Sequence, residues 1–432
     1  MTDFDIIVVG AGPAGSAAAI VAARAGKRVA LIERGPFPGA KNMYGGVVYG
    51  RILDDLIPNW WEQAPIQRWV VRRGTMVATA TQSLTVDVRS TAWGQAPYNG
   101  ATALRPDFDA WMAQHAVEVG ATLVCATTVT GLLKDGDQIV GVRTDRPDGE
   151  LTAKVVIACD GVNSFLAKEA GLYPNFHADH FTLGVKEVLQ FDKKTIDQRF
   201  NVRGREGVDY EIVGVTGGVP GGGFIYTNLE SVAVGVVLRL PELAASKRRP
   251  EAIIAEMKQH AAIAPLVEGG ELIEYSAHLI PEAGFDAMPE IVGDGLLVAG
   301  DAAGLCLAAG IWLEGVNFAI GSGVAAARAA VRAVGSGDAS RDGLASYRAT
   351  LESNFVLKDH RKLRRVPELL MSDRFQRRYP DVACGIAEQM FTVRNPAPKR
   401  GVRSIAQQEL KRAGVRMRDV PKDAWAAMRS FG

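Results

Sequence analysis

The sequence predicts an α/β fold, in which a Rossmann-like domain holds an inserted antiparallel β-sheet domain and is followed by a helical C-terminal tail. Three observations predict it. The first 35 residues read as strand, glycine-rich turn, helix and strand, residues 180–240 alternate between strand-length apolar runs and turns, and the last 75 residues are polar and helical. A chain of 432 residues exceeds what one hydrophobic core usually spans, so more than one domain is expected.

The N-terminal stretch is predicted to be a right-handed βαβ unit. Residues 4–9 (FDIIVV) and 28–32 (RVALI) are apolar runs of strand length. Between them, residues 16–25 are rich in alanine and favour a helix, which Gly26 ends. Two buried strands joined by one helix over so short a stretch belong to one parallel sheet.

A G-x-G-x-x-G motif connects the first strand to the helix. Its first glycine suits the tight turn, its second lets the backbone approach a pyrophosphate, and its third lets helix and strand pack closely. The helix N-terminus offers free N–H groups to phosphates, and the acid that ends the second strand can accept hydrogen bonds from ribose hydroxyls. The residues expected to bind a dinucleotide here are Gly10, Gly12, Pro13, Ala14, Gly15, Glu33 and Arg34.

A second motif, far along the chain, indicates which dinucleotide is bound. Residues 295–304 (GLLVAGDAAG) read as a strand that ends near Asp301 and is followed by small residues that open a helix. A carboxylate in this place suits a hydrogen bond to a ribityl chain, and a dinucleotide with a ribityl chain is FAD. By itself GDAAG would suit an ordinary strand-to-helix turn, but together with the first motif it predicts FAD, with Gly300, Asp301 and Gly304 at the site.

Three further positions have both a functional and a structural interpretation. Asp160 and Gly161 follow a strand end, where many FAD-dependent proteins approach the cofactor, but the pair also suits a plain turn. Arg105 precedes a helix and could pair with the pyrophosphate, because a guanidinium fork fits phosphate, or could be a surface arginine. Val129 is also expected to line the site.

Six stretches resemble a known family over nearly the whole chain. They are GAKNMYGGVVYG (39–50), LRPDFDAWM (104–112), GVKEV (184–188), GGGFIYTN (221–228), EYSAHLIPEAG (274–284) and GDGLLVAGDAAG (293–304). In these stretches the chain resembles the FixC-type electron-transfer-flavoprotein:quinone oxidoreductases of the geranylgeranyl-reductase-like FAD superfamily. The resemblance implies an FAD-binding domain of the glutathione-reductase-2, hydroxylase-like type.

The resemblance also implies a function and partners. FAD would lie between the nucleotide domain and the antiparallel sheet, take electrons from a partner flavoprotein and pass them to a membrane quinone. In complexes of this kind, paired FixA and FixB subunits bifurcate electrons from NADH, and a small ferredoxin-like FixX subunit carries an iron–sulfur centre. Nitrogen fixation is the process with which the resemblance associates such a complex.

The same resemblance implies two further parts of the site. Lys41, Asn42, Gly45 and Gly46 would lie against the isoalloxazine ring, where a glycine-rich linker with a solvated lysine is the alternative. Gly310, in the segment GIWLEG, would lie near the reactive edge of the flavin.

Charge is distributed unevenly along the chain, although the formal net charge is only +1. Residues 358–432 contain 18 Lys/Arg against 8 Asp/Glu, so the body is acidic and the tail basic. A basic tail suits an acidic protein or an anionic lipid surface, and a solvated helix face is the alternative. Given the resemblance, we expect the ferredoxin-like subunit to dock there, and we expect no nucleic-acid partner.

Neither a metal site nor a catalytic side chain is predicted. The four cysteines are scattered without a C-x-x-C pair, so buried thiols are expected and any iron–sulfur cluster belongs to another chain. Flavin electron transfer needs no acid–base residue, because the cofactor carries the chemistry. We expect a cytoplasmic protein, with peripheral attachment to the inner face of the membrane as the alternative, because no secretory signal and no bilayer-spanning apolar run is present.

Other functions on the same fold remain as alternatives. Geranylgeranyl reductases saturate isoprenoid double bonds and typically show Y-x-W-x-F-P in the sheet that faces the flavin, where this chain reads GGGFIYTN. Aromatic hydroxylases usually carry an arginine soon after the serine of the Asp-Gly motif, where this chain has Phe165, Leu166 and Ala167 after Ser164. A non-catalytic electron-transfer subunit is a third interpretation.

The predicted organisation has three parts. Residues 1–175 and 285–335 form a discontinuous FAD-binding domain, residues 176–284 form an antiparallel-sheet domain for quinone or substrate, and residues 336–432 form a basic helical region. Because no second glycine fingerprint follows a strand, no nicotinamide domain is evident, and the electrons are expected to come from a partner protein.

Overall fold

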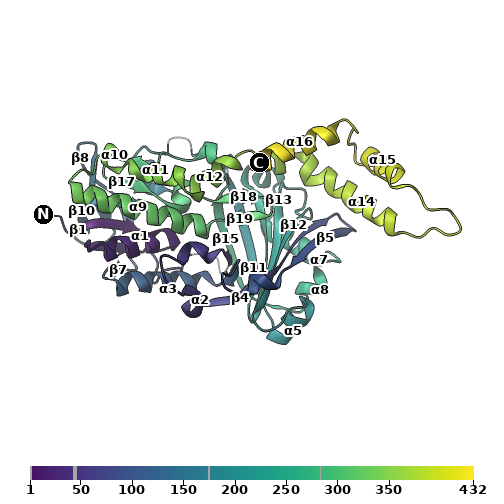
Figure 1. The fold of residues 1–432 in the computed structure, drawn as a ribbon, viewed down its shortest axis with the longest axis horizontal. Helices are drawn as coiled ribbons and strands as arrows, with labels where there is room; N and C mark the ends of the chain where they lie inside the picture. The colour runs from purple at the N-terminus through teal and green to yellow at the C-terminus, as the bar shows by residue number, and fades with distance from the viewer. Residues whose placement is uncertain (1, 42–45, 174–175, 283) are drawn as a thin grey trace.

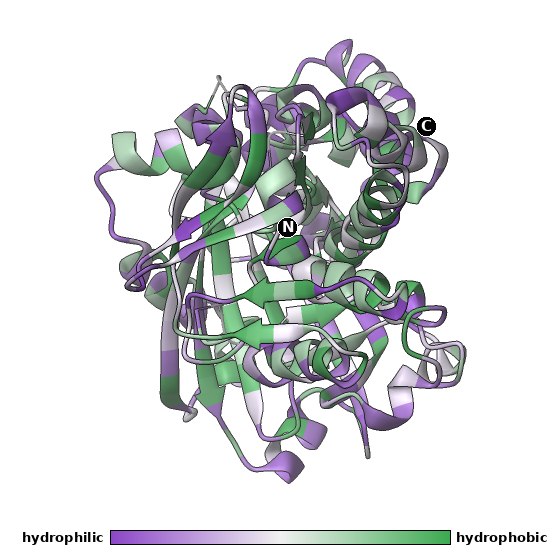
Figure 2. Cartoon of the chain, turned by 90° about the vertical axis from the view of Figure 1, so that its left-hand side faces the viewer, coloured by the Kyte–Doolittle hydropathy of each residue, from purple (hydrophilic) through white to green (hydrophobic). Residues whose placement is uncertain are grey.

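The fold consists of two large β-sheets that lie next to each other, a small two-stranded sheet, helices around them and a C-terminal helical arm (Figure 1). The computed structural model describes residues 2–41, 46–173, 176–282 and 284–432. Figure 2 shows hydrophobic residues along the strands and hydrophilic residues in the outer loops and helices. This distribution is expected where two sheets bury apolar faces under helices.

The first sheet has the strand order β16-β17-β10-β1-β2-β7, and the hairpin of β8 and β9 joins it at β10. The strands β17, β10, β1, β2 and β7 run parallel, as the predicted βαβ unit requires. The bounds are β1 Phe4–Val9, β2 Val29–Ile32, β7 Thr122–Val124, β8 Val129–Asp135, β9 Gln138–Thr144, β10 Glu150–Ala158, β16 Val292–Gly293 and β17 Leu296–Val298.

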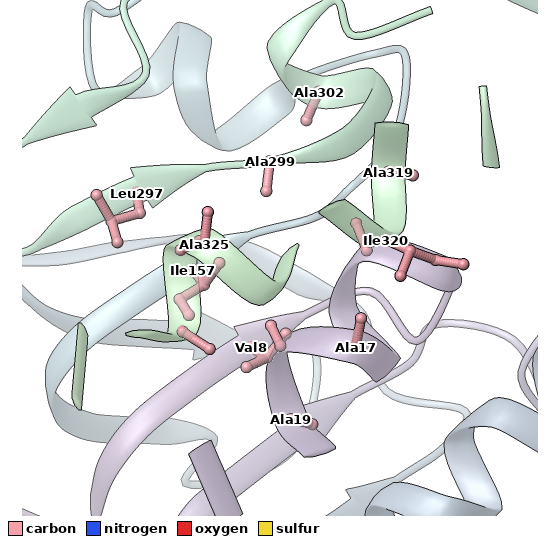
Figure 3. Packing of buried hydrophobic residues seen from close by; sticks show 14 of the residues in the cluster. Val8, Ala17, Ala19, Ile157, Leu297, Ala299, Ala302, Ala319, Ile320 and Ala325 are labelled. Atoms are coloured by element: carbon pink, nitrogen blue, oxygen red, sulfur yellow. The ribbon is translucent and has the colours of Figure 1, made fainter. Parts of the chain in front are cut away.

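Two helices rich in small residues cover one face of this sheet. The predicted N-terminal helix is α1 (Pro13–Arg24), and the long helix after the second motif is α9 (Val316–Ser336). Small residues let the two helices approach each other closely, since a Cβ on Gly323 of α9 would lie 2.0 Å from the carbonyl oxygen of Ala14 of α1. Figure 3 shows Ala17 of α1 next to Ile320 of α9. The helix α3 (Arg105–Glu118) packs against the other side of α1. This core fixes both glycine-rich motifs at one edge of the sheet.

The second sheet has nine strands in the order β15-β11-β14-β13-β12-β4-β6-β3, with β5 paired to β4. Its pairs are antiparallel, apart from the parallel pair of β4 and β12. The bounds are β3 Gly46–Val48, β4 Ile66–Ala78, β5 Ser83–Arg89, β6 Ala101–Ala103, β11 Phe181–Gln190, β12 Glu206–Val213, β13 Gly221–Thr227, β14 Ser231–Arg239 and β15 Glu271–Pro281.

Sheet membership differs in one respect from the predicted organisation. Residues 46–103, which the prediction placed in the FAD-binding part, supply β3, β4, β5 and β6 of the second sheet. The long strand β4 was not recognised because Arg68, Arg72 and Arg73 interrupt its apolar run, yet all three arginines have acidic or carbonyl partners in the structure. The domain boundaries themselves stay a prediction.

The two faces of the second sheet have different chemistry. One face is apolar, including Val185, Ile225 and Val234, and it packs under α5 (Lys193–Arg199), α6 (Leu240–Ser246), α7 (Pro250–Gln259) and α8 (Ala264–Val267). The strand alternation places polar side chains on the opposite face, among them Lys186 and Asp209, which are nonetheless buried. A buried polar sheet face indicates a site.

The C-terminal region is helical, as predicted. Helices α14 and α15 extend beyond the sheets as an arm, and α16 returns the chain to the body (Figure 1). None of the helices in the described ranges is long and apolar enough to cross a membrane. The bounds are α10 Arg341–Leu344, α11 Ser346–Ser353, α12 Phe355–Lys362, α13 Val366–Leu370, α14 Tyr379–Phe391, α15 Val402–Arg412 and α16 Asp419–Phe431.

Candidate functional site

The glycine motif forms a tight turn between β1 and α1. Gly10 has φ +98°, and a Cβ there would lie 2.3 Å from the carbonyl oxygen of Cys159. A Cβ on Gly15 would lie 1.8 Å from the carbonyl oxygen of Gly10. Gly12 differs, because no described residue other than its chain neighbours lies within 4 Å of its Cβ position. The first and third glycines are therefore required by the packing of the chain, and the second faces open space that a phosphate can occupy.

The start of α1 offers backbone N–H groups to that open space. Gly12 is the N-cap and provides no side-chain oxygen, and Pro13 occupies the first turn. The first turn contains no acidic residue that would compete with an anion. Ala14 is buried and lies where the two motifs meet, because a Cβ added to Gly300 would lie 2.9 Å from the Cβ of Ala14.

Glu33 lies at the end of β2, beside the glycine turn. Its carboxylate accepts the backbone N–H of Ala11 at 3.0 Å and that of Gly35 at 2.6 Å. These two bonds fix the carboxylate while leaving further lone pairs for a ribose hydroxyl. Arg34, the next residue, is exposed.

The third predicted element lies where β10 ends. Asp160 accepts the backbone N–H of Leu166 through Oδ2 at 3.1 Å, whereas Oδ1 is buried and has no hydrogen-bond partner among the described residues. Burial raises the pKa of this carboxyl above its ordinary value. Gly161 has φ +77° and open space at its Cβ position. An unsatisfied buried acceptor beside open space suits the hydroxyls of a bound ligand.

The second motif forms a 3₁₀ turn, Gly300–Ala303, after β17. Asp301 lies in this turn, and burial raises its pKa while the nearby His278 and Arg105 act in the opposite direction. His278 belongs to β15 of the other sheet, so the two sheets meet at Asp301. Gly304 ends the turn with φ +71°.

Arg105 begins α3 and has a partner within the chain. Its Nε and Nη2 donate to the two carboxylate oxygens of the buried Asp109 at 2.8 and 2.9 Å. This two-point pair fixes the guanidinium. Its charge interacts with those of Asp301 and Lys186, which lie close to it. Contact with a pyrophosphate stays a prediction for Arg105.

Residues of the second sheet complete the site, and the sequence interpretation assigned them no role. Lys186 is fully buried on β11, and its Nζ lies 3.5 Å from the hydroxyl of Tyr226 on β13. Burial lowers the pKa of Lys186 to about 7. The signal in the sequence was a lysine followed by a glutamate between the apolar residues of GVKEV.

The segment predicted to contact the isoalloxazine is only partly within the described residues. Lys41 is exposed and Gly46 begins β3, whereas Asn42 and Gly45 lie outside the described residues. Val129 begins β8 and is half-buried. Contact of these residues with the cofactor stays a prediction.

Gly310 occupies the turn of a small hairpin, β18 (Leu307–Ala309) and β19 (Trp312–Glu314), and has φ +74°. The tip exposes three consecutive apolar side chains, with 51% of Ile311, 36% of Trp312 and 42% of Leu313 accessible. Arg73 of β4 donates from Nη2 to the carbonyl oxygen of Ile311 at 2.8 Å, which holds the tip against the second sheet.

The residues at this edge fit FAD. The open backbone at Gly12, the positioned carboxylate of Glu33 and the unsatisfied oxygen of Asp160 lie at the carboxyl ends of parallel strands, where dinucleotides bind in such sheets. Asp301 lies at the end of another strand of the same sheet, as a ribityl-binding carboxylate requires.

Models of two protein families match this chain. A model of the FAD dependent oxidoreductase family matches residues 5–202, and a model of the ETF-QO/FixC family C-terminal domain matches residues 366–432. Protein FixC of Salmonella typhi is 41% identical over 397 residues, which cover 91% of this chain and 92% of that protein. The chain belongs to the ETF-QO/FixC family.

As a member of this family, the chain is an FAD-dependent oxidoreductase. A second relative, the probable electron transfer flavoprotein-quinone oxidoreductase YdiS of Escherichia coli K12, is 38% identical over 413 residues, 95% of this chain and 96% of YdiS. Among solved structures, a geranylgeranyl bacteriochlorophyll reductase-like protein from Thermoplasma acidophilum has a TM-score of 0.72 at 20% identity, covering 95% of this chain and 99% of that one. That structure supports the fold only.

Proposed function

We propose that this chain receives electrons at its FAD from a partner electron-transfer flavoprotein and passes them to a membrane quinone. The observation that carries the proposal is the exposed apolar tip of the β18–β19 hairpin, close in the chain to the Asp301 turn. An apolar quinone is recognised by such a surface, whereas a polar metabolite is not. The name of YdiS, a probable electron transfer flavoprotein-quinone oxidoreductase related along 95% of this chain, agrees with this acceptor.

In this proposal the side chains of the chain bind and orient the cofactor. Bound FAD supplies reversible electron transfer, and the protein supplies its position and surroundings. The N-terminus of α1 and Gly12 hold the phosphates, Glu33 holds the ribose, and Asp160 and Asp301 hold polar groups nearer the ring. The buried polar face of the second sheet, with Lys186, excludes water on the other side of the site.

The proposal assigns the other redox steps to partner chains. The cysteines are unpaired, and burial raises the pKa of the thiols of Cys159 and Cys306, which disfavours the thiolates that iron would need. Within the described ranges, no three His, Cys, Asp or Glu side chains converge as metal ligands. We therefore assign the iron–sulfur centre to a small ferredoxin-like subunit and the bifurcation of electrons from NADH to paired flavoprotein subunits.

The basic C-terminal region is the surface we assign to the ferredoxin-like subunit. Four exposed cations lie at the end of α12 and just after it, and two of them already have acidic neighbours: Arg361 lies 3.4 Å from Glu352, and Arg364 lies 3.7 Å from Asp286. Surface pairs of this kind contribute little to stability and leave the cations available to an acidic partner. The four residues are Arg361, Lys362, Arg364 and Arg365.

Co-expression of this chain with the paired flavoprotein subunits and the small ferredoxin-like subunit tests the proposal. We expect the four chains to copurify and to reduce a short-chain ubiquinone at the expense of NADH. Reversal of the four cations to glutamate should release the small subunit, while reversal of the exposed Lys134 and Lys154 should not. If the complex instead saturates geranylgeranyl lipids and leaves quinone unchanged, the reductase alternative replaces the proposal.

A further inference from the structure

Two carboxylates and one guanidinium form a buried cluster on the polar face of the second sheet. Asp209 and Glu211 are two residues apart on β12, so both side chains point to the same face. Arg73 of β4 is the register partner of Asp209, and its guanidinium lies 3.4 Å from that carboxylate and 2.6 Å from Glu211. Only 9% of the Asp209 side chain and 10% of the Glu211 side chain are exposed.

The charges in this cluster do not balance if every acid is ionised. Arg73 is the cation that faces both carboxylates, and Glu314 of β19 brings a third carboxylate close to it. Among the described residues, Tyr49 and Tyr226 are also close to the cluster, and burial raises their pKa values, so they stay neutral. Arg73 Nε makes no hydrogen bond to the described residues, although it faces Asp209.

A second buried carboxylate beside one guanidinium favours the protonated form of one acid. Burial and the charge of Asp209 together raise the pKa of Glu211 to about 7, against the opposing effect of Arg73. Burial likewise raises the pKa of Asp209 to about 6. One proton is therefore shared by the pair near neutral pH, as in other closely spaced carboxylates.

The position of the cluster connects it to both parts of the site. On one side, Asp209 is the register partner of Tyr226, whose hydroxyl lies 3.5 Å from Lys186 Nζ. On the other side, Arg73 donates to the carbonyl oxygen of Ile311 at the exposed apolar tip of the hairpin. The cluster therefore lies between the buried polar wall of the cofactor site and the surface where an apolar acceptor would arrive.

We propose that Arg73, Asp209 and Glu211 form a proton-holding site that donates a proton to the quinone reduced beside the β18–β19 hairpin. The inference rests on the proposed function, because quinol formation consumes protons. Two electrons and one proton leave the anionic reduced FAD, a second proton leaves the carboxyl of Glu211, and two O–H bonds form on the quinone. The Glu211 carboxylate then regains a proton from solvent, so the site is restored.

The test compares two electron acceptors for the holoprotein after anaerobic reduction with dithionite. A short-chain ubiquinone takes up protons with its electrons, whereas ferricenium takes one electron and no proton. In Glu211→Gln, we expect ubiquinone to reoxidise the FAD at least about tenfold more slowly than in the parent protein, with the ferricenium rate unchanged. Glu206→Gln is the matched control, because Glu206 lies on the same strand and pairs with Arg89 at 2.7 Å near the surface.

The pH profile separates proton donation from a structural role. For the parent protein, the ubiquinone rate should fall as pH rises through about 7, where Glu211 loses its proton. Asp209→Asn removes a neighbouring negative charge, so it should move this fall to lower pH without abolishing it. Thermal unfolding of each variant confirms that it is folded.

The rates with the two acceptors and the infrared band decide the proposal. It is overturned if Glu211→Gln reacts with ubiquinone at the parent rate, or if the variant slows both acceptors equally. If the parent protein reduces ferricenium but not ubiquinone, the proposed function fails, and the proton-holding site is then tested by infrared difference spectroscopy. A protonated-carboxyl band that is lost in Glu211→Gln supports the site, and no such band in the parent protein overturns it.

Discussion

The carboxylate of Glu33 accepts the backbone N–H of Ala11 at 3.0 Å, which joins the end of β2 to the glycine turn after β1. Gly35 donates a second N–H to the same carboxylate at 2.6 Å. The acid is therefore oriented by the chain before any ligand arrives. Preorganised groups bind with less loss of conformational freedom, so this relationship predicts how the nucleotide end of the site responds to substitution.

Glu33→Gln should weaken FAD binding. Glutamine keeps one acceptor oxygen and replaces the other with an NH₂ group that faces a backbone N–H, so one hydrogen bond is lost and two donors oppose each other. Hydrogen bonds to charged groups contribute about 1.5–3 kcal/mol, so the Kd for FAD should rise by at least about tenfold. Titration of the apoprotein with FAD, followed by fluorescence quenching, measures this Kd. Glu230→Gln, at an exposed position, is the control. An unchanged Kd would contradict the assigned role.

Alanine substitutions at two glycines of the same motif should change the stability of the apoprotein by different amounts. In Gly15→Ala, the new methyl would meet the Gly10 carbonyl oxygen at 1.8 Å, so the free energy of unfolding should fall by about 1–3 kcal/mol or more. In Gly12→Ala, the methyl meets no atom of the described chain, so the stability of the apoprotein should change by less than about 1 kcal/mol.

FAD binding separates these two variants further. The methyl of Gly12→Ala occupies the open space next to the first turn of α1, so the Kd for FAD should rise although the apoprotein folds. Urea unfolding of the apoprotein and titration with FAD measure the two effects. Equal destabilisation of both variants would show that Gly12 has a packing role like that of Gly15.

The sequence predicted the parts of the fold that depend on near neighbours. Strand, turn, helix and acid follow one another within the βαβ unit, so Gly10, Gly12, Gly15 and Glu33 were placed correctly in it. Asp301 was recognised because its turn directly follows an apolar strand, but its proximity to His278 depends on two sheets coming together. Local patterns specify elements, whereas contacts between sheets depend on the whole topology.

The polar residues of the second sheet were not predicted, because their contacts are made between strands that lie far apart in the chain. Arg73 lies on β4 and Asp209 on β12, two strands that pair although they are far apart in the sequence. The arginines of β4 interrupt its apolar pattern, so the sequence did not indicate a buried strand there. The available signal was alternation, since Asp209 and Glu211 occupy every second position of β12 while the intervening Tyr210 belongs to the opposite face. Polar residues on one face of a buried strand indicate a site, but only the register shows what they meet.

Lys186 should make the stability of the apoprotein depend on pH in the alkaline range. Burial lowers its pKa to about 7 in the folded state, against 10.5 for an ordinary lysine. Between these pH values the unfolded chain holds more protons than the folded one, so stability should rise with pH. The comparison of Lys186→Met with the parent protein by urea unfolding at several pH values should show a smaller rise in the variant. Lys194, whose side chain is exposed, provides the control as Lys194→Met, and equal slopes in all three proteins would contradict the burial of a titrating amine.

The apolar hairpin tip should determine how well the protein uses an apolar acceptor. Ile311→Ser and Leu313→Ser remove exposed apolar surface and leave the glycine-rich turn between β1 and α1 unchanged, so the Kd for FAD should stay the same. Burial of such a side chain against a ligand contributes about 1.5–3 kcal/mol, so the KM for a short-chain ubiquinone should rise by about tenfold while the ferricenium rate stays unchanged. Val88→Ser, on the exposed strand β5, is the matched control because its side chain is equally accessible, at 50%. An equal effect of all three variants, or none, would mean that quinone reaches the flavin by another route.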